Sequence, residues 1–274
     1  MAMVINTNIS SIAAQNSLHT SSLNQQRAME RLSSGLRINN AKDDAAGLAI
    51  SSRMTASIRG MAAAIRNAND GISATQTAEG SLAAIQDSLQ RIRELAVQSA
   101  NDTNAAADHT SLHTEATALI GEINRVVAVT TFNGVGLING SFTSQSIQVG
   151  SSNTANDAIT VTIANAHATA LGINSISLTT TGGSTTALGL LDTAINTITA
   201  ARASMGAYQN QLNAAITNLH NTSMNLAASR SRILDTDYAA ETTNLAKAQI
   251  IQQAATAMLA QANGSSQTVL ALLK

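Results

Sequence analysis

The chain has 274 residues, of which 11% are charged, against about 25% in an ordinary soluble domain. Proline, cysteine and tryptophan are absent, so disulfides, thiolate metal sites and cysteine nucleophiles are excluded. A net charge of −1 and an aromatic content of 1% argue against nucleic-acid binding, and no apolar run approaches the ~20 residues of a membrane span.

The N-terminal half predicts helices. Near the start, Ile5, Ile9 and Ile12 recur at helical spacing in an almost uncharged stretch. A long helix follows from residues spaced three or four apart, namely Ile58, Met61, Ile65, Ala68, Ile72, Thr75, Glu79, Leu82, Ile85, Leu89, Ile92 and Ala96, of which Thr75 and Glu79 are the two polar exceptions. A shorter helix is predicted by the same spacing at Leu112, Ala116, Leu119, Ile123 and Val126. The turn-forming residues 101–104 between them indicate an antiparallel helical hairpin.

The middle of the chain is different in character, because residues 126–201 contain no Lys or Arg and are rich in Thr, Ser, Asn and Gly. Asn-Gly pairs at residues 133–134 and 139–140 are hairpin-type turns. Apolar residues alternate with polar ones at 147–149 and 159–163, which predicts a short antiparallel hairpin. Residues 179–186, with two adjacent glycines, are expected to form a loop.

Helical periodicity returns in the last third of the chain. A ladder recurs every seven residues at Leu191, Ile198, Met205, Leu212, Leu219, Leu226 and Ile233, which predicts a left-handed helical seam. A weaker terminal helix is indicated by Leu245, Ala248, Ile251, Ala255, Met258 and Ala262. We therefore predict a mainly α fold of long antiparallel helical rods with heptad seams, a coiled-coil terminal domain and a small antiparallel β-hairpin region. The nearly uncharged ends need burial against something in order to fold.

No credible active site emerges, so we expect neither enzymatic activity nor a cofactor. His109 and His113 have the spacing of a zinc pair, but no third ligand is obvious, and a solvated pair is the preferred interpretation. Gly134 and Gly136 lack the third glycine of a dinucleotide loop. Adjacent Asp43 and Asp44 point apart on a helix, so they favour capping or a surface ion pair over acid–base chemistry.

Arginines and acids alternate along the first hundred residues. One interpretation is a solvated face with helix pairs such as Asp87 with Arg91. The other is a set of polar contacts between subunits of an assembly, because arginine favours fixed, multidentate contacts. The sequence leaves both open.

Both ends of the chain resemble bacterial flagellins. The N-terminal motifs are LSSGLRINNAKDDAAGLAI at residues 32–50, RNANDGIS at 66–73, LQRIRELAVQSAN at 89–101 and FNG at 132–134. The C-terminal motifs are SRSRILDTDYA at 229–239 and QAN at 261–263. Residues 141–189 carry no recognisable motif.

The resemblance implies a structural subunit of the flagellar filament, exported unfolded and assembled through its terminal helices into a helical tube that acts as a motility propeller. It implies an inner terminal domain of residues 1–45 and 235–274, an outer helical rod of 46–140 and 187–234, and a short variable region of 141–186. Implied partners are further copies of the chain, the flagellar export apparatus, an export chaperone, and the filament cap and hook-junction proteins. The expected location is the secreted, extracellular filament.

Two sets of site residues follow from the resemblance. The assembly set comprises Ile5, Ile9, Ile12, Arg31, Leu32, Arg37, Ile38, Lys42, Asp43, Asp44, Arg230, Arg232, Ile233, Leu245, Ile251, Ala255, Met258 and Leu259. The second set matches flagellins that Toll-like receptor 5 recognises, and comprises Gln90, Arg91, Leu95, Gln98 and Glu115. Arg91, Leu95 and Gln98 are spaced to share one helix face, which is equally consistent with a polymer contact.

Three other classes of protein remain as alternatives. A hook–filament junction-type axial protein would share the helical termini. An enzyme hidden in the middle segment is disfavoured by that segment's lack of Lys, Arg, Glu and Cys between residues 141 and 189. A coiled-coil adhesin would explain the heptads but not the motifs at both ends.

Overall fold

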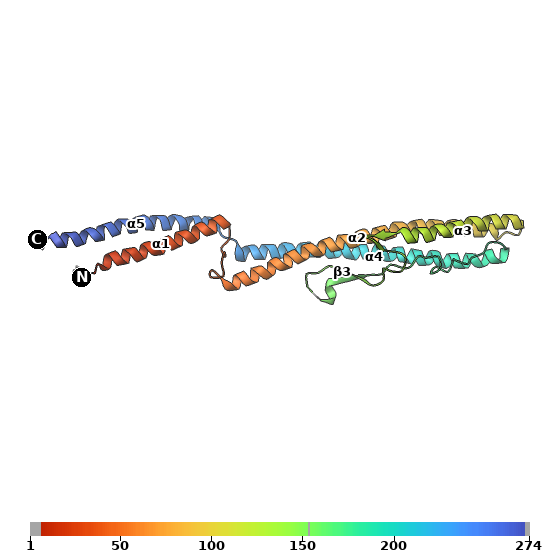
Figure 1. Ribbon diagram of the computed structural model, residues 1–274, viewed down its shortest axis with the longest axis horizontal. Coiled ribbons are helices and arrows are strands. Elements are labelled where there is room, and N and C mark those ends of the chain that lie inside the picture. The colour runs from red at the N-terminus through yellow and green to blue at the C-terminus, as the bar shows by residue number, and fades with distance from the viewer. Residues whose placement is uncertain (1–6, 153, 272–274) are drawn as a thin grey trace. The chain divides into compact units, whose positions relative to one another are not determined.

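The computed structural model describes residues 7–152 and 154–271. Over those residues the elements are α1 (Ile9–Ser34), α2 (Ala45–Ser99), α3 (Ala106–Val129), β1 (Thr131–Phe132), β2 (Val135–Gly136), β3 (Gln145–Gln148), the 3-10 helix η1 (Ala155–Asp157), β4 (Ala158–Val161), α4 (Thr181–Leu234) and α5 (Tyr238–Ala271) (Figure 1). The predicted fold of long helices with small antiparallel sheets is confirmed. Ile5, one of the predicted assembly residues, lies outside the described residues.

The described residues divide into two compact units. The rod unit comprises residues 57–224, and the terminal unit comprises the residues up to 56 together with those from 225 onward. Helices α2 and α4 contribute residues to both units. The domain boundaries expected at residues 45, 140, 186 and 234 stay predictions.

The rod unit has a continuous apolar core between α2, α3 and α4. Leu82, Ile85, Leu89 and Ile92 of α2 are fully buried, as the spacing of three and four predicts. Polar contacts fix the antiparallel register of α2 and α4: Arg93 pairs with Asp192 at 2.6 Å and Arg202 donates to Gln86 at 2.7 Å.

The seven-residue ladder on α4 is buried only in part. Leu191, Ile198, Met205 and Leu212 are fully buried, whereas Leu219, Leu226 and Ile233 are half-buried. A Cβ at Gly71 of α2 would clash with Ile147 of β3 and lie 3.3 Å from Leu212, so this glycine lets the hairpin approach the helices closely.

Two short hairpins follow α3. Strand β1 pairs with β2 across a two-residue turn in which Asn133 and Gly134 have φ of 50° and 78°, the left-handed conformation that an Asn-Gly turn favours. Strands β3 and β4 are antiparallel with Ile147 opposite Ile159, which confirms the predicted hairpin. Asn139-Gly140 bends the chain but joins no strands, because the residues after it leave the sheet and run towards β3.

Residues 162–180 form an irregular strap that packs into the rod core. Ala168 N donates to Asn124 Oδ1 of α3 at 3.1 Å, and Ser99 Oγ of α2 donates to the Leu178 carbonyl at 2.7 Å. The strap buries Ile163, Ala166, Ala168, Leu171, Ile173, Ile176 and Leu178. A segment expected to be a variable loop region therefore supplies core residues.

The predicted loop at 179–186 is wrong beyond Thr180, because α4 begins at Thr181. Thr180 caps the helix: its Oγ1 accepts from Gly183 N at 3.2 Å and its carbonyl accepts from Ser184 N at 2.9 Å. The N–H groups of a first helical turn lack intrahelical partners, so a threonine cap outweighs the glycines that follow it.

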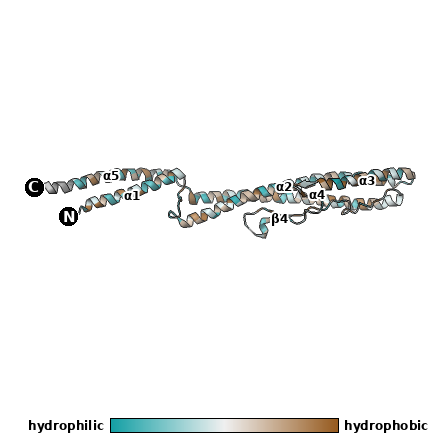
Figure 2. Cartoon of the chain, in the orientation of Figure 1, coloured by the Kyte–Doolittle hydropathy of each residue, from teal (hydrophilic) through white to brown (hydrophobic). Residues whose placement is uncertain are grey.

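In the terminal unit, α1 and α5 run antiparallel and side by side (Figure 1). Asn8 caps α1 by accepting from Ser11 N at 3.1 Å, and Gly35, at φ 71°, ends it in the left-handed conformation that glycine favours. Hydrophilic and hydrophobic residues alternate along both helices (Figure 2). None of the helices, over the residues that the structure covers, is both long and apolar enough to cross a membrane.

The strap's place in the core yields a stability prediction. Ile173→Ala, at a fully buried position, is expected to lower the free energy of unfolding by about 2–5 kcal/mol. Val97→Ala, at a position 52% exposed on α2, is the matched control and should change it by less than about 0.5 kcal/mol. Urea denaturation followed by circular dichroism measures both, and equal effects would contradict the core assignment.

Candidate assembly interface

The fully buried positions of the seam between α1 and α5 hold small and polar residues, and four leucines stand beside them half-buried. The buried positions are Ser11, Ser21 and Ala28 on α1, and Glu241, Ala248 and Ala255 on α5. Half-buried residues complete the spacing of three and four, at Ala14, Leu18, Gln25 and Leu32 on α1 and at Leu245, Gln252, Leu259 and Ala262 on α5. Because these side chains bury little apolar area, the pair is weakly stabilised by burial.

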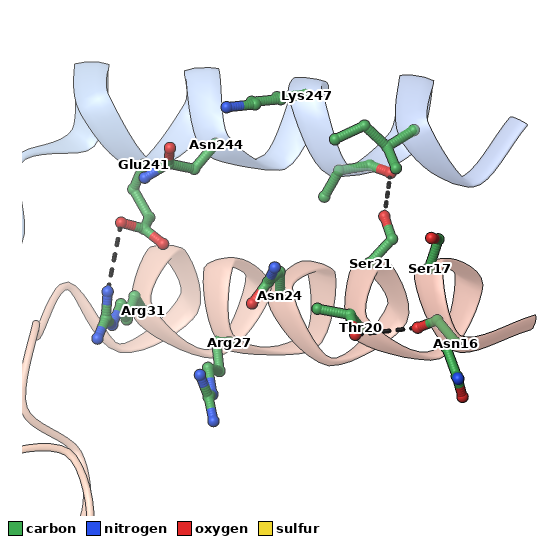
Figure 3. A pocket seen from close by; sticks show the side chains of 12 residues that line it. Asn16, Ser17, Thr20, Ser21, Asn24, Arg27, Arg31, Glu241, Asn244 and Lys247 are labelled. Atoms are coloured by element: carbon green, nitrogen blue, oxygen red, sulfur yellow. Dashed lines mark hydrogen bonds and ion pairs between the residues drawn. The ribbon is translucent and has the colours of Figure 1, made fainter. Parts of the chain in front are cut away.

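Polar contacts fasten this seam at intervals along its length. Ser21 Oγ donates to the Ala248 carbonyl at 2.7 Å, and Ser11 Oγ donates to Asn263 Oδ1 at 3.1 Å. Nearer the loops, Arg31 and Glu241 form an ion pair at 3.7 Å (Figure 3). The Glu241 residue is 7% exposed, so Arg31 compensates a carboxylate that has little contact with solvent.

Large apolar side chains of the terminal unit point away from the seam. On α1, Ile9 is 69% exposed, with Ile12, Leu23 and Met29 also exposed. On α5, Ile250 and Met258 are 66% and 65% exposed, and Ile251 is exposed too. The pair thus buries small and polar residues most completely, keeps four leucines half-buried and leaves its isoleucines and methionines exposed, unlike a self-sufficient coiled coil.

A polar groove of about 660 Å³ runs along one side of the seam (Figure 3). Asn16, Thr20 and Arg27 line it from α1, and Asn244 and Lys247 line it from α5. Over the described part of the chain, Arg27 and Lys247 make no ion pair. The groove therefore presents two uncompensated cations.

Several of the predicted assembly residues lie in the loop between α1 and α2, where they contact other residues of the same chain. Ile38 is buried, at 2% exposure, and Asp44 caps α2 by accepting from Gly47 N at 2.8 Å. Asp43 Oδ2 accepts from the backbone of Asn40 at 3.0 Å and of Asn39 at 3.2 Å. The capping interpretation of this acid pair is confirmed, while Lys42 is exposed.

The backbone N–H of Asn40 is the main reason that the pKa of Asp43 lies below its usual value. The N–H of Asn39 and the charges of Lys42 and Arg31 lower it further, while burial works against them. A pKa that is lower in the folded state gives stability that is present above the ordinary carboxyl range and is lost as the pH falls through the folded pKa. This loop contact is therefore fully formed at neutral pH.

The other predicted assembly residues lie near the end of α4 and along α5. Arg230 donates to Thr55 at 3.4 Å and Arg232 to Ser229 at 3.0 Å. Ile233 is half-buried, and its carbonyl accepts from Arg37. Leu245, Ala255 and Leu259 belong to the seam, whereas Ile251 and Met258 lie outside it.

The residues expected to contact a receptor lie on the rod unit. Arg91 on α2 forms ion pairs with Glu115 on α3 at 2.8 Å and with Glu94 at 3.0 Å. The hydrogen bond with Glu115 is the main reason that the pKa of Arg91 lies above its usual value, and the bond with Glu94 raises it further. The expected Asp87 partner is wrong, because Glu94 and Glu115 occupy the guanidinium.

Leu95 does not share the exposed surface of that set. Its side chain is 1% exposed and belongs to the rod core, so the expected surface contact through Leu95 is wrong. With 3.6 residues in each helical turn, Leu95 lies on the same side of α2 as Ile92, towards α3 and α4. Gln90, Arg91, Gln98 and Glu115 remain exposed.

The two spaced histidines are not a solvated pair. His109 is buried and its Nδ1 lies 2.7 Å from Ser99 Oγ, while His113 is half-buried with Nδ1 3.5 Å from Leu178 N. They hold the strap against α3. Among the described residues, no group of three or more His, Cys, Asp or Glu side chains could bind a metal.

Sequence reasoning missed the true seam residues of α1. Ile9 and Ile12, which are assembly residues in the sequence prediction, are exposed and lie outside the seam, and their role in assembly stays a prediction. A signal for the seam was present in the sequence, since residues 11, 14, 18, 21, 25, 28 and 32 repeat with heptad spacing. Their composition hid it, because Ser, Ala and Gln hold all of these positions except the leucines at 18 and 32.

This fold defines a class of protein: a structural subunit of long helices whose terminal pair leaves large apolar side chains exposed. A model of the bacterial flagellin N-terminal helical region matches residues 5–143, and a model of the flagellin C-terminal helical region matches residues 188–273. The flagellin of Xenorhabdus nematophila is 42% identical over 315 aligned positions that cover all of both chains. That of Halalkalibacterium halodurans is 42% identical over 272, covering 99% of this chain and 100% of the relative.

The crystal structure of Bacillus cereus flagellin agrees with these matches. Its sequence is 30% identical to this chain, and the TM-score of the two structures is 0.50. The match covers 94% of the Bacillus cereus chain and 60% of this one. The chain belongs to the bacterial flagellin family. It is a structural subunit of the extracellular flagellar filament, a homo-oligomer, and not an enzyme.

The buried ion pair of the seam yields a prediction about assembly. Arg31→Ala leaves the Glu241 carboxylate buried without its cation, whereas Glu241→Gln removes the charge itself. We expect the free-chain concentration in equilibrium with filaments to rise about tenfold for Arg31→Ala and roughly threefold for Glu241→Gln.

Sedimentation of filaments and quantification of the supernatant measure this difference. The double variant Arg31→Ala/Glu241→Gln should assemble better than Arg31→Ala alone. An effect of Glu241→Gln as large as that of Arg31→Ala would contradict the assignment of a buried charge.

Proposed function

We propose that copies of this chain join through their terminal units, with the exposed apolar faces of α1 and α5 packing against those of neighbouring copies. The observation that carries the proposal is the inversion of polarity in this unit. Small and polar residues fill the seam, while Ile9, Ile12, Ile250 and Met258 face outward. A contact that does not close into a ring propagates as a helical tube.

We further propose that the terminal helices order fully only on assembly. A seam of Ser, Ala and Gln offsets little of the conformational entropy lost when two long segments become helical. Neighbouring copies supply the missing burial by covering the large apolar side chains. The ends of the free chain then remain close to the coil state, and the filament holds them as helices.

Export in an unfolded state suits the same composition. The chain has no cysteine to crosslink and no proline to isomerise slowly, so it can be threaded through a channel without either delay. The proposed partners are the flagellar export apparatus with its chaperone, and the cap and hook-junction proteins at the two limits of the filament.

Recognition of the free chain by Toll-like receptor 5 is a separate proposal, placed on the rod unit. Gln90, Arg91, Gln98 and Glu115 form its exposed surface, and Arg91 is held there by two carboxylates. A guanidinium fixed in this way loses little freedom on binding. Leu95 acts only from the core, where it packs α2 in place.

Truncation tests the assembly proposal. A chain lacking residues 1–35 and those after 236 should not elongate short filament seeds, while the full chain elongates them. The truncated chain retains the rod unit, and near-identical thermal unfolding of that unit serves as the folding control. Elongation by both chains, observed by negative-stain electron microscopy, would refute assembly through the terminal helices.

Substitution at Arg91 tests the receptor proposal. Arg91→Ala is expected to raise the half-maximal concentration for receptor signalling by roughly 30-fold, the effect of losing one interface hot spot. Arg93→Ala is the matched control, because Arg93 pairs with Asp192 on α4 and faces another side of α2. Signalling by Arg91→Ala at the potency of the unsubstituted chain would refute the assignment.

A further inference from the structure

The two loops of the terminal unit meet in a small set of hydrogen bonds, which we call the clasp (residues 35–37 with 233–236). Leu36 and Asp235 form an isolated antiparallel β-bridge. Arg37 N donates to the Leu234 carbonyl at 2.7 Å, and Thr236 N donates to the Gly35 carbonyl at 3.0 Å. The clasp therefore joins the chain where α1 ends to the chain where α5 is about to begin.

The Arg37 side chain strengthens the clasp. Its Nη2 and Nε both donate to the Ile233 carbonyl, at 2.7 Å and 3.2 Å. Ile233 lies in the last turn of α4, whose carbonyls have no partner within the helix. A cation at this end of a helix is also favoured by the helix dipole. Arg37 thus caps α4 and binds the α1–α2 loop to it in one contact.

The seam that extends from the clasp specifies its own register poorly. Most of its heptad positions hold serine, alanine or glutamine, and its four leucines (Leu18, Leu32, Leu245 and Leu259) are only half-buried, so packing distinguishes weakly between the native pairing and one slipped by seven residues. The buried Glu241 adds a second distinction: a slip of one heptad would place Asn24 where Arg31 now stands. The antiparallel pair therefore needs an external reference point.

We propose that the clasp is that reference point, with Arg37 as the positioning residue that sets the register of α1 against α5. The pairing then extends from the clasp through Arg31–Glu241 and Ser21–Ala248 towards Ser11–Asn263. Correct register decides which apolar side chains stand side by side on the outer surface, so a slipped pair presents the wrong face to its neighbours. This inference rests on the proposed assembly through the terminal unit.

Engineered cysteines test the register directly, because the chain has none of its own. Ser21→Cys with Ala248→Cys reports the native register, and Ala14→Cys with Ala248→Cys reports the slip of one heptad that places Asn24 opposite Glu241. Each pair is made in the full chain, with Arg37 intact, with Arg37→Ala, with Arg37→Lys and with Arg27→Ala as the matched control. Arg27 is an exposed arginine of α1 outside the clasp.

Each double-cysteine chain is added as a minor fraction to an excess of cysteine-free full chain, seeded, and oxidised in the filament. With Arg37 intact, or with Arg27→Ala, we expect the 21–248 crosslink to dominate over the 14–248 crosslink by about tenfold or more. With Arg37→Ala we expect that ratio to fall to roughly one to three, with Arg37→Lys intermediate because it keeps one donor. The minor fraction keeps the assay informative even if Arg37→Ala cannot elongate alone.

An unchanged crosslink ratio in the Arg37→Ala filaments would overturn the register proposal. So would an equal fall in the Arg27→Ala control, because the effect would then belong to any loss of charge on α1. Failure of assembly through the terminal unit has a different signature: the truncated chain described above would elongate seeds as well as the full chain does.

Discussion

The weak seam between α1 and α5 is the constraint on which the rest of this structure depends. Two long helices meet through Ser11, Ser21 and Ala28 on one side and through Ala248 and Ala255 on the other. Such a seam gives direction and spacing but little free energy. The large apolar side chains of the same helices are free for contacts with other copies, so the stability of the terminal unit is shared with the filament.

The rod unit follows the opposite design. Its core is continuous, with Leu, Ile and Met at the facing positions of α2, α3 and α4 and with the strap inserted beside them. It holds surface features, including the Arg91 cluster, in a defined geometry. We propose that a chain divided in this way combines a self-contained part with a part whose folding is linked to polymerisation.

Hydrophobic periodicity predicted the long helices, the β3–β4 hairpin and the buried upper rungs of the α4 ladder, because large apolar residues in those elements face a single core. It indicated the helix α1 but not its seam, where the buried positions are small or polar. The helix-face argument for Arg91, Leu95 and Gln98 missed the burial of Leu95, because residues that share a face by spacing can still differ in burial when other helices cover part of that face. The strap was missed because its apolar residues follow no regular period. The receptor set and most of the assembly set came from resemblance, not from spacing.

Amide hydrogen exchange on α1 and α5, compared between the free chain and the filament, tests the central claim most directly. The account predicts rapid exchange along residues 9–32 and 245–262 in the free chain, strong protection of the same residues in the filament, and similar protection of the rod core in both states. Slow exchange of both helices in the free chain, equal to that in the filament, would show that the seam is stable alone and would contradict the account.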